Sequence, residues 1–207
     1  MFTSQRRRGS NPLWGGAGWR RVVWRAFVAI PIAASPEREA LLSALRDEAP
    51  SVKAVAAGHL HLTLAFLGDV ADDAAPALAA ALDAAASKHA PTTCVLRAVG
   101  AFPDTRRPRV VWAGVADESP LVALAHDVRG HLAEAGFPGD RKAFQPHLTL
   151  GRVRPHRDGR DAARFVAAHV GVELGTFGLD HLRLHRSTLG PQGPHYDVVH
   201  QAPLGGS

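Results

Sequence analysis

Short stretches of this chain alternate hydrophobic and polar residues, and longer stretches with helical spacing lie between them. Alternation with a period of two predicts half-buried strands, whereas apolar residues three and four positions apart predict amphipathic helices. We expect strands over residues 22–32, 52–56, 61–68, 94–99, 110–115, 147–150, 177–184 and 196–200, and helices over 36–48, 73–89, 121–135 and 161–169. Because this order lacks a regular βαβ alternation, it is typical of an α+β fold.

Local signals mark two helix starts. Ser35 precedes Pro36 and Glu37, and a capping side chain followed by a proline and an acid in the first turn predicts a helix N-terminus. Asp72 and Asp73 are expected to cap the Ala-rich helix that follows them.

The tetrapeptide His-Leu-Thr-Leu occurs twice, at residues 61–64 and 147–150. Residues i and i+2 of a strand share a face, so His61 and Thr63 are expected to point one way while the leucines point into the core. The same expectation holds for His147 and Thr149. Two imidazoles and two hydroxyls at the same spacing predict a two-fold site that combines an acid with a base.

Length and composition indicate a globular protein. The chain has 207 residues, of which 46% are hydrophobic, enough for one compact domain or two closely packed lobes. It contains no run of 18 apolar residues, so no membrane span is expected. The single cysteine, Cys94, can form no internal disulfide, which is typical of a reducing, cytoplasmic compartment. We expect residues 1–21 to be a disordered extension and residues 22–207 to form one bilobal domain, as a monomer.

The formal net charge of +5 comes from the N-terminal segment. Residues 1–25 carry six arginines and no acid, which leaves 18 basic and 19 acidic residues in the rest of the chain. Within this near-neutral remainder, seven basic residues and only two acids lie between Arg141 and Arg164. This distribution favours a local phosphate-binding face beside the second motif, and it argues against a long surface for duplex nucleic acid.

In both motifs and their surroundings, the chain resembles the two-histidine (2H) phosphoesterase superfamily, whose hallmark is a pair of H-x-[ST]-x motifs. The closer resemblance is to its RNA 2′,3′-cyclic phosphodiesterase branch, also called 2′-5′ RNA ligase. The matching segments are RAFVAIPI, HLHLTLAFLGDV, AFPDTRRPRVVWAGV, FQPHLTLGRVR and LRLHRSTLGPQGPHYDVVH, in the same order. The resemblance implies a bilobal α+β fold with two pseudo-symmetric lobes of antiparallel sheet and helices around a central cleft. A tyrosine often stands in this family where the chain has His185.

The resemblance also implies an activity, which is metal-free hydrolysis of a 2′,3′-cyclic phosphate at an RNA end to a 2′-phosphate, without a cofactor. It makes His61 the proton donor to the leaving oxygen and His147 the proton acceptor that activates water, an order that the residues alone do not fix. Thr63 and Thr149 are expected to hydrogen-bond the phosphate oxygens. Arg152 is implied as a further phosphate ligand.

The position of Arg152 conflicts with simple strand periodicity. It follows His147 by five residues, and an odd offset on an unbroken strand would turn it to the opposite face. A bend or bulge after Gly151 would bring Arg152 back toward the phosphate.

Several alternatives stay open on the sequence alone. The motifs are also compatible with a 2H enzyme for a small cyclic nucleotide such as ADP-ribose cyclic phosphate, with a 2′-5′ RNA ligase, and with a noncatalytic protein that binds RNA ends. The expected partners are therefore RNA ends or small cyclic nucleotides. His59 and His61 form an H-x-H pair of the kind that can bind metal, but no acid or third histidine is close in sequence, so no metal is expected.

Overall fold

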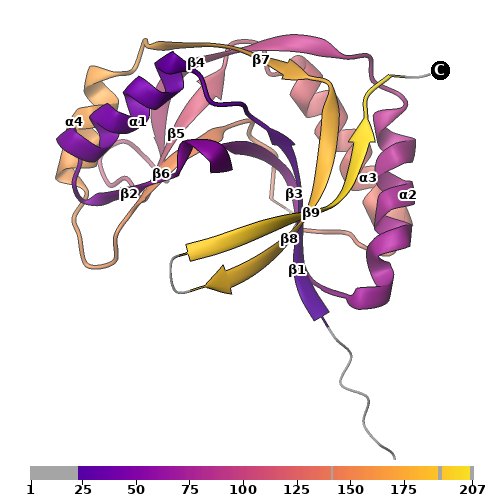
Figure 1. Ribbon diagram of the computed structural model, residues 1–207. Helices are drawn as coiled ribbons and strands as arrows, with labels where there is room; N and C mark the ends of the chain where they lie inside the picture. The colour runs from indigo at the N-terminus through magenta and orange to yellow at the C-terminus, as the bar shows by residue number, and fades with distance from the viewer. Residues whose placement is uncertain (1–22, 141, 191–192, 206–207) are drawn as a thin grey trace, which may run out of the picture.

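A computed structural model describes residues 23–140, 142–190 and 193–205, whose strands form two antiparallel sheets (Figure 1). The four-stranded sheet has the order β3–β1–β8–β9 and is built from His61–Ala71, Val23–Pro31, His181–Gly190 and Gly193–Pro203. The five-stranded sheet has the order β2–β6–β5–β4–β7 and is built from Val52–Ala54, Leu148–Val153, Val110–Val115, Thr92–Phe102 and Glu173–Leu179. Each sheet carries one of the two motifs, so the predicted α+β fold with two antiparallel lobes is confirmed.

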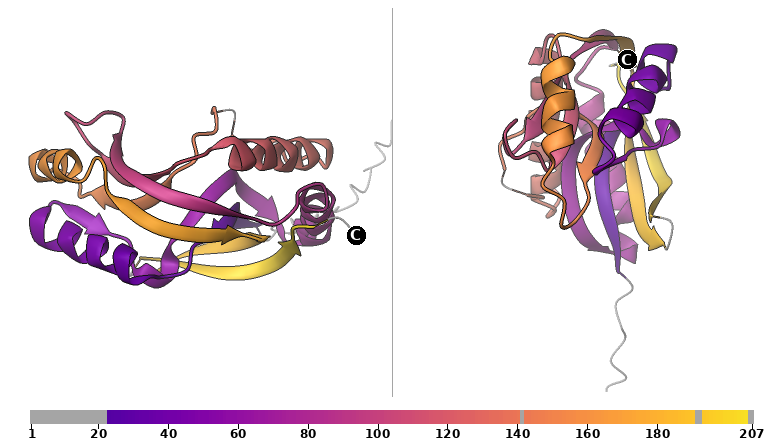
Figure 2. Two further views of the ribbon diagram at one scale, coloured as in Figure 1. Left: turned by 90° about the horizontal axis from the view of Figure 1, so that it is seen from above. Right: turned by 90° about the vertical axis from the view of Figure 1, so that its left-hand side faces the viewer.

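The α-helices of the described chain lie in pairs at the two ends of the molecule (Figure 2). At one end, α1 (Pro36–Glu48) contacts β7 and α4 (Arg160–Ala168) contacts β4, so this pair covers the five-stranded sheet. At the other end, α2 (Ala75–Ala86) packs on β8 and β9, and α3 (Ser119–Glu134) packs on β3. Both pairs leave the junction between the two sheets uncovered, which is where the motifs lie.

The chain passes back and forth between the two sheets. Strand β2 comes from the N-terminal half but pairs with β6, whereas β8 comes from the C-terminal half and pairs with β1. The prediction of one strand over residues 177–184 was wrong, because the chain breaks at Asp180 into β7 and β8, which belong to different sheets. The residue pattern is almost continuous through this point, and periodicity cannot reveal a change of sheet.

The two predicted helix starts differ in outcome. Ser35 caps α1, and its side chain accepts a hydrogen bond from the Arg38 backbone N–H at 3.4 Å, as predicted. Asp72 and Asp73 do not cap α2; they form a short 3₁₀ turn (Asp72–Ala74), and α2 begins at Ala75. Pro76 explains the shift, because proline is tolerated in the first helical turn but not further inside.

One hydrophobic core runs through both sheets. The four leucines of the two motifs are fully buried within it, whereas His61, Thr63, His147 and Thr149 are partly exposed. The alternation predicted for the motifs is therefore present in both strands. Cys94 is a free, buried residue of the same core. None of the described helices has the length and apolar character needed to cross a membrane. Residues 1–21, predicted to be an extension, lie outside the described residues.

Candidate active site

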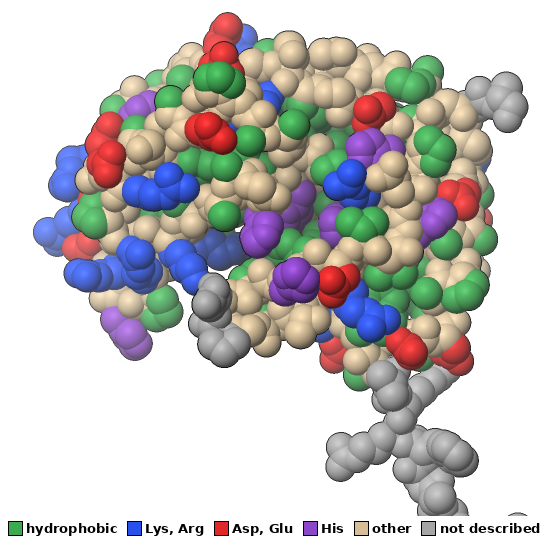
Figure 3. Space-filling view, in the orientation of Figure 1, with side chains coloured by type: hydrophobic (Ala, Val, Ile, Leu, Met, Phe, Trp, Pro, Cys, Tyr) green, Lys and Arg blue, Asp and Glu red, His purple; other side chains and the backbone are tan. Residues whose placement is uncertain are grey.

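The two motifs occupy corresponding places in their sheets and meet where the sheets adjoin. Strand β3 begins at His61, and β6 begins directly after His147. The two strands belong to different sheets but lie against each other. The space-filling view shows histidine side chains around a hollow in the centre of this face (Figure 3).

Both motif histidines are oriented in the same way. The Nδ1 atom of His61 lies 2.8 Å from the carbonyl oxygen of His59, and Nδ1 of His147 lies 2.7 Å from the carbonyl oxygen of Gln145. A carbonyl only accepts, so Nδ1 carries the hydrogen in each ring, and Nε2 is left to exchange protons with a ligand. The backbone two residues before each histidine thus sets its tautomer, which is the arrangement that acid–base catalysis requires.

Aromatic side chains enclose His61. Its ring centroid lies 5.2 Å from that of Phe27 and 5.4 Å from that of Tyr196, which meets it edge-on. Burial lowers the pKa of His61 below its ordinary value of 6.5; the hydrogen bond to the His59 carbonyl opposes this, and the charges of His59 and Arg152 lower the pKa further. An anionic phosphate beside this imidazole would supply the missing counter-charge and raise its pKa again.

His185 is a third histidine in this group and was not among the predicted site residues. It is buried and stacks on Phe27 at 4.9 Å, with its ring centroid 6.4 Å from that of His61. Burial above all, and then the charges of His61 and Arg183, lower its pKa to about 4. At neutral pH, His185 is therefore uncharged.

The surroundings of His147 are simpler. Phe102, at the end of β4, meets the imidazole edge-on with ring centroids 5.0 Å apart, and Phe102 in turn rests on Trp112 at 5.2 Å. The aromatic contact and the Gln145 carbonyl hold the ring in place from two sides. The two imidazoles thus sit in unequal environments, a prerequisite for giving one the role of acid and the other the role of base.

Each motif strand contains a β-bulge at the same position. In the pairing of β3 with β1, Thr63 lies opposite Ala29 and Ala65 opposite Val28, so Leu64 has no partner. In the pairing of β6 with β5, Leu150 is left over in the same way, between Thr149 and Gly151. An extra residue reverses the face on which later side chains lie.

The bulge at Leu150 resolves the conflict over Arg152. The sequence predicted an irregularity after Gly151, whereas the bulge lies just before it. The bulge returns Arg152 to the face of His147 and Thr149. Burial, the largest influence, lowers the pKa of His61 and raises that of Tyr196. The positive charge of Arg152 acts on both groups and lowers both pKa values. A guanidinium from the second motif thus faces the first motif across the junction, so the two motifs share one cleft.

Phe66 occupies the place in the first motif that Arg152 occupies in the second. Each residue follows its motif histidine by five positions and comes after the bulge. Phe66 is 52% exposed, a large value for a phenylalanine, and its ring lies 6.3 Å from that of Phe27. The pseudo-symmetry therefore places a cation on one side of the cleft and an aromatic surface on the other, a combination suited to a phosphate joined to a base.

Gly151 permits the close approach of β2 to the second motif. A Cβ atom at this position would lie 2.5 Å from Cγ1 of Val52 and 3.0 Å from the carbonyl oxygen of Lys53. The residue after the His-Leu-Thr-Leu sequence thus has to be glycine for β2 to pair with β6. This pairing sets Lys53 directly opposite Arg152.

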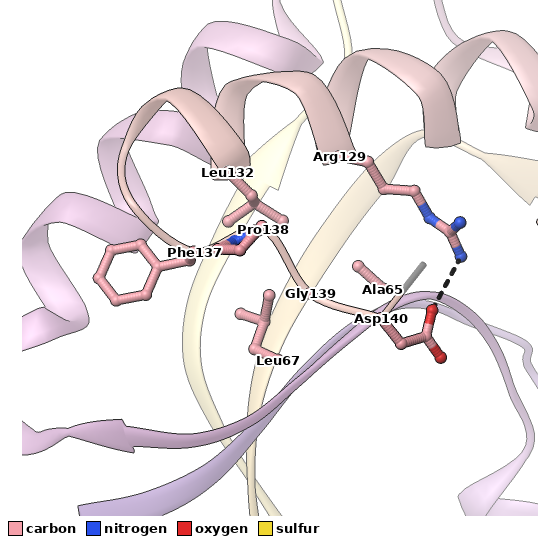
Figure 4. A pocket seen from close by; sticks show the side chains of 8 residues that line it. All are labelled: Ala65, Leu67, Arg129, Leu132, Phe137, Pro138, Gly139 and Asp140. Atoms are coloured by element: carbon pink, nitrogen blue, oxygen red, sulfur yellow. Dashed lines mark ion pairs between the residues drawn. The ribbon is translucent and has the colours of Figure 1, made fainter. Parts of the chain in front are cut away.

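Arg129 on α3 links the first motif to the loop that leads into the second. Its Nε donates to the carbonyl of the bulge residue Leu64 at 2.9 Å, and its Nη1 donates to the carbonyl of Lys142 at 2.7 Å. Figure 4 shows the same guanidinium beside Asp140, 3.9 Å away, and it also lies over the ring of Phe144 at 5.5 Å. One side chain thus connects the first motif to the loop before the second.

Replacing Arg129 with methionine is expected to lower the free energy of unfolding by about 1–3 kcal/mol, because the Leu64 carbonyl loses its partner inside the fold. Urea denaturation followed by circular dichroism measures this. The matched control is Arg46→Met on α1, since Arg46 is exposed; its effect should stay within about 0.5 kcal/mol. Equal stability of the two variants would show that Arg129 does not carry this link.

The H-x-H pair does not form part of a wider ligand group. Among the described residues, no three His, Cys, Asp or Glu side chains lie together in a way that could hold a metal ion. His59 instead meets Tyr196 edge-on, with ring centroids 5.7 Å apart. The side chains available at the cleft are therefore suited to proton transfer and anion binding.

The predicted site residues lie in one region, and sequence reasoning missed several of their neighbours. Phe27, Arg129, His185 and Lys53 lie outside both motifs. The sequence signal for Phe27 and His185 is that RAFVAIPI and the tail segment belong to the resemblance, which does not reveal which side chains face the cleft; Lys53 and Arg129 lie outside the matching segments. Their contacts with the motifs depend on the pairing of β1 with β3 and β8 and of β2 with β6.

Comparison with known proteins places this architecture in a family. Residues 33–190 match the sequence model of the 2′-5′ RNA ligase superfamily. The chain is 36% identical to an RNA 2′,3′-cyclic phosphodiesterase of Archaeoglobus fulgidus over 174 residues, which cover 83% of this chain and 96% of that protein. It is 34% identical to an RNA 2′,3′-cyclic phosphodiesterase of Aquifex aeolicus, with coverage of 72% and 79%.

Solved structures agree with the sequence comparison. A protein of Thermus thermophilus superposes with a TM-score of 0.70 at 32% identity, covering 88% of this chain and 99% of that one. Escherichia coli LigT, crystallised with 3′-AMP, superposes with a TM-score of 0.66 at 26% identity and the same coverage. The fold and its paired motifs define a 2H phosphoesterase, and the chain belongs to the 2′-5′ RNA ligase superfamily.

Proposed function

We propose that this protein is an RNA 2′,3′-cyclic phosphodiesterase that hydrolyses the cyclic phosphate at an RNA end to a 2′-phosphate without a metal ion. The observation that carries the proposal is the matched pair of imidazoles, each held through Nδ1 by a carbonyl two residues earlier and each free at Nε2. Curated relatives with the corresponding name, covered over most of their length, support the same substrate.

The reaction needs two proton transfers at one phosphorus. His147 takes a proton from water, whose oxygen forms a new bond to phosphorus in line with the departing 3′ oxygen. The bond from phosphorus to that 3′ oxygen breaks, and His61 gives the oxygen a proton, so that a 3′-hydroxyl and a 2′-phosphate remain. The imidazole pair ends with the proton transferred from His61 to His147, and exchange with solvent resets it.

Thr63, Thr149 and Arg152 stabilise the charge that grows on the non-bridging oxygens. Both threonines are partly exposed on the same faces as their histidines, so their hydroxyls can donate to a phosphate between the strands. Arg152 is exposed, and no carboxylate in the described part of the chain pairs with it. A guanidinium free of acidic partners is suited to a bidentate contact with phosphate.

End-group analysis tests the proposed function. RNA that ends in a 2′,3′-cyclic phosphate is incubated with the protein in excess chelator, and the product phosphate is located by its susceptibility to enzymes specific for 2′- or 3′-phosphates. We expect complete conversion to the 2′-phosphate at a rate that the chelator does not change. A 3′-phosphate product would place the acid on the other oxygen, and dependence on added metal would contradict the metal-free mechanism.

A further inference from the structure

Lys53 extends the cationic side of the cleft beyond Arg152. The two residues pair directly across β2 and β6, so their side chains share a face with Cα atoms about 5 Å apart. Because Arg152 faces the cleft, Lys53 does as well. Its Nζ lies 3.7 Å from where a Cβ would stand on Gly193, at the start of β9 in the opposite sheet. The ammonium therefore sits at the mouth of the gap between the two sheets.

The row of cations continues past Lys53 away from the histidines. Arg154 stands two residues after Arg152, and its guanidinium is held at the end of β2 by the carbonyl of Val52 at 3.1 Å and by that of Pro50. Beyond it, in the loop before α4, the backbone carbonyl of Arg157 accepts from Arg109 at 3.0 Å. Figure 3 shows Lys and Arg side chains in a row over this part of the face, leading to the central hollow.

The row ends at a surface hollow of about 320 Å³ beside α4. Two acids line this hollow. Asp161 accepts hydrogen bonds from the backbone N–H and the hydroxyl of Ser51, and Asp158 forms an ion pair with Arg160 at 3.1 Å. Arg157 and Arg164 also line this hollow, and no carboxylate of the described chain pairs with either. The lining thus holds three arginines against two carboxylates, so the hollow is cationic overall.

Acids next to the four-stranded sheet pair with some of its cations. Asp72 pairs with Arg186 of β8 at 3.0 Å, and Asp83 of α2 pairs with His200 of β9 at 2.7 Å. Arg186 and His200 are thus paired with carboxylates, and Arg183 of β8 donates to the side chain of Gln201 at 2.9 Å; on the β2–β6 side, no ion pair within the described chain engages Lys53, Arg152 or Arg154. An anionic chain that leaves the cleft therefore meets more cations without a carboxylate partner on the β2–β6 side than on the other side.

We infer that the substrate is an oligoribonucleotide whose backbone leaves the catalytic cleft over Lys53 and continues to Arg157 and Arg164. This inference rests on the proposed function, because a 2′,3′-cyclic phosphate marks the 3′ end of a chain and leaves only the 5′ side to extend. Lys53 binds the phosphate next to the cyclic one, and the guanidinium groups at the hollow bind phosphates further upstream. A cyclic mononucleotide fills only the part of the site around the histidines.

Kinetics on substrates of graded length test the inference. The substrates are a 2′,3′-cyclic mononucleotide and oligoribonucleotides of two, three and six residues with the same cyclic end. For the unchanged protein we expect kcat/KM to rise with length, on the order of 10-fold for each additional phosphate that the protein binds. In Lys53→Gln/Arg157→Gln, kcat/KM on the hexamer should fall at least about 10-fold more than on the mononucleotide.

Salt dependence provides a second readout, and Lys88 provides the control. The slope of log kcat/KM against log salt on the hexamer should become shallower by about 1.4 in the double variant, because each phosphate of a single strand that is no longer neutralised removes about 0.7. Lys88→Gln, on an exposed lysine after α2, should leave both rates and the slope unchanged. Equal kcat/KM for all lengths, or equal slopes in the double variant and the control, would overturn the inference. Absence of hydrolysis of every substrate by the unchanged protein would instead overturn the proposed function.

Discussion

Replacing either His61 or His147 with alanine is expected to lower kcat/KM on an RNA 2′,3′-cyclic phosphate by about 10²–10⁴-fold. In the proposed mechanism, each imidazole handles one of the two protons of the reaction. His185 lies near His61, with ring centroids 6.4 Å apart, but burial above all lowers its pKa to about 4, so at neutral pH it is uncharged and cannot replace an imidazolium as the acid. The loss should appear in kcat as well as in kcat/KM.

The fold should tolerate both substitutions. Each ring is partly exposed and is hydrogen-bonded through Nδ1 to a single backbone carbonyl. Circular dichroism and the urea midpoint should therefore stay close to those of the unchanged protein. His126→Ala, on an exposed histidine of α3, serves as the control and should retain full activity. The double variant should be little slower than the single ones, since the two residues act as a unit. Turnover close to that of the unchanged protein in either single variant would remove that residue from the mechanism.

Arg152→Met is expected to lower kcat/KM by about 10²–10³-fold, the usual loss when one preorganised donor to a developing oxyanion is removed. Arg152 lies in the cleft because the bulge at Leu150 turns it there, and its charge acts on His61 and Tyr196 from the opposite sheet. Arg152→Lys keeps the charge but loses the planar pair of donors, so it should recover only part of the activity.

Steady-state kinetics of Arg152→Met, Arg152→Lys and the control Arg46→Met measure this contribution. Arg46 lies on α1 and is exposed, so its replacement removes the same charge from a different part of the surface. If Arg152→Met hydrolysed the substrate within about twofold of the control, the guanidinium would be a surface group only. A loss confined to KM would instead show that Arg152 binds substrate and transition state equally.

The strand faces of the site residues were predictable because they depend on a local rule. A period of two places His61 with Thr63 and His147 with Thr149, whichever strand pairs beside them. The leucines of both motifs are fully buried, as that rule requires. The paired motifs also indicated the α+β fold and the family, and the family comparison agrees with both.

The rest of the site depends on contacts between distant segments. Arg152 faces the cleft only because β5 passes Leu150 without a partner, and a single sequence does not show which residue a neighbouring strand skips. Lys53 reaches the same face through the pairing of β2 with β6, and Arg129 reaches Leu64 from α3. The division of residues 173–190 into β7 and β8 was hidden for the same reason, since both strands satisfy one pattern of alternation but lie in different sheets.

The pH dependence of the two single variants tests most directly whether His61 and His147 act as acid and base on one phosphate. In His147→Ala, the residual kcat/KM depends on protonated His61, so it should fall as the pH rises. The midpoint of this fall should lie below 6.5, because burial lowers the pKa of His61 in the free protein. The fall in kcat should lie at higher pH, since the bound phosphate favours the imidazolium.

In His61→Ala, the residual kcat/KM depends on neutral His147, so it should rise with pH and then level off. The expected result is a bell-shaped pH profile for the unchanged protein, a profile that only falls with pH for His147→Ala, and one that only rises for His61→Ala. If His147→Ala rose with pH and His61→Ala fell, His147 would be the acid and His61 the base. Flat profiles from about pH 5 to 9 in all three proteins would contradict catalysis by paired histidines.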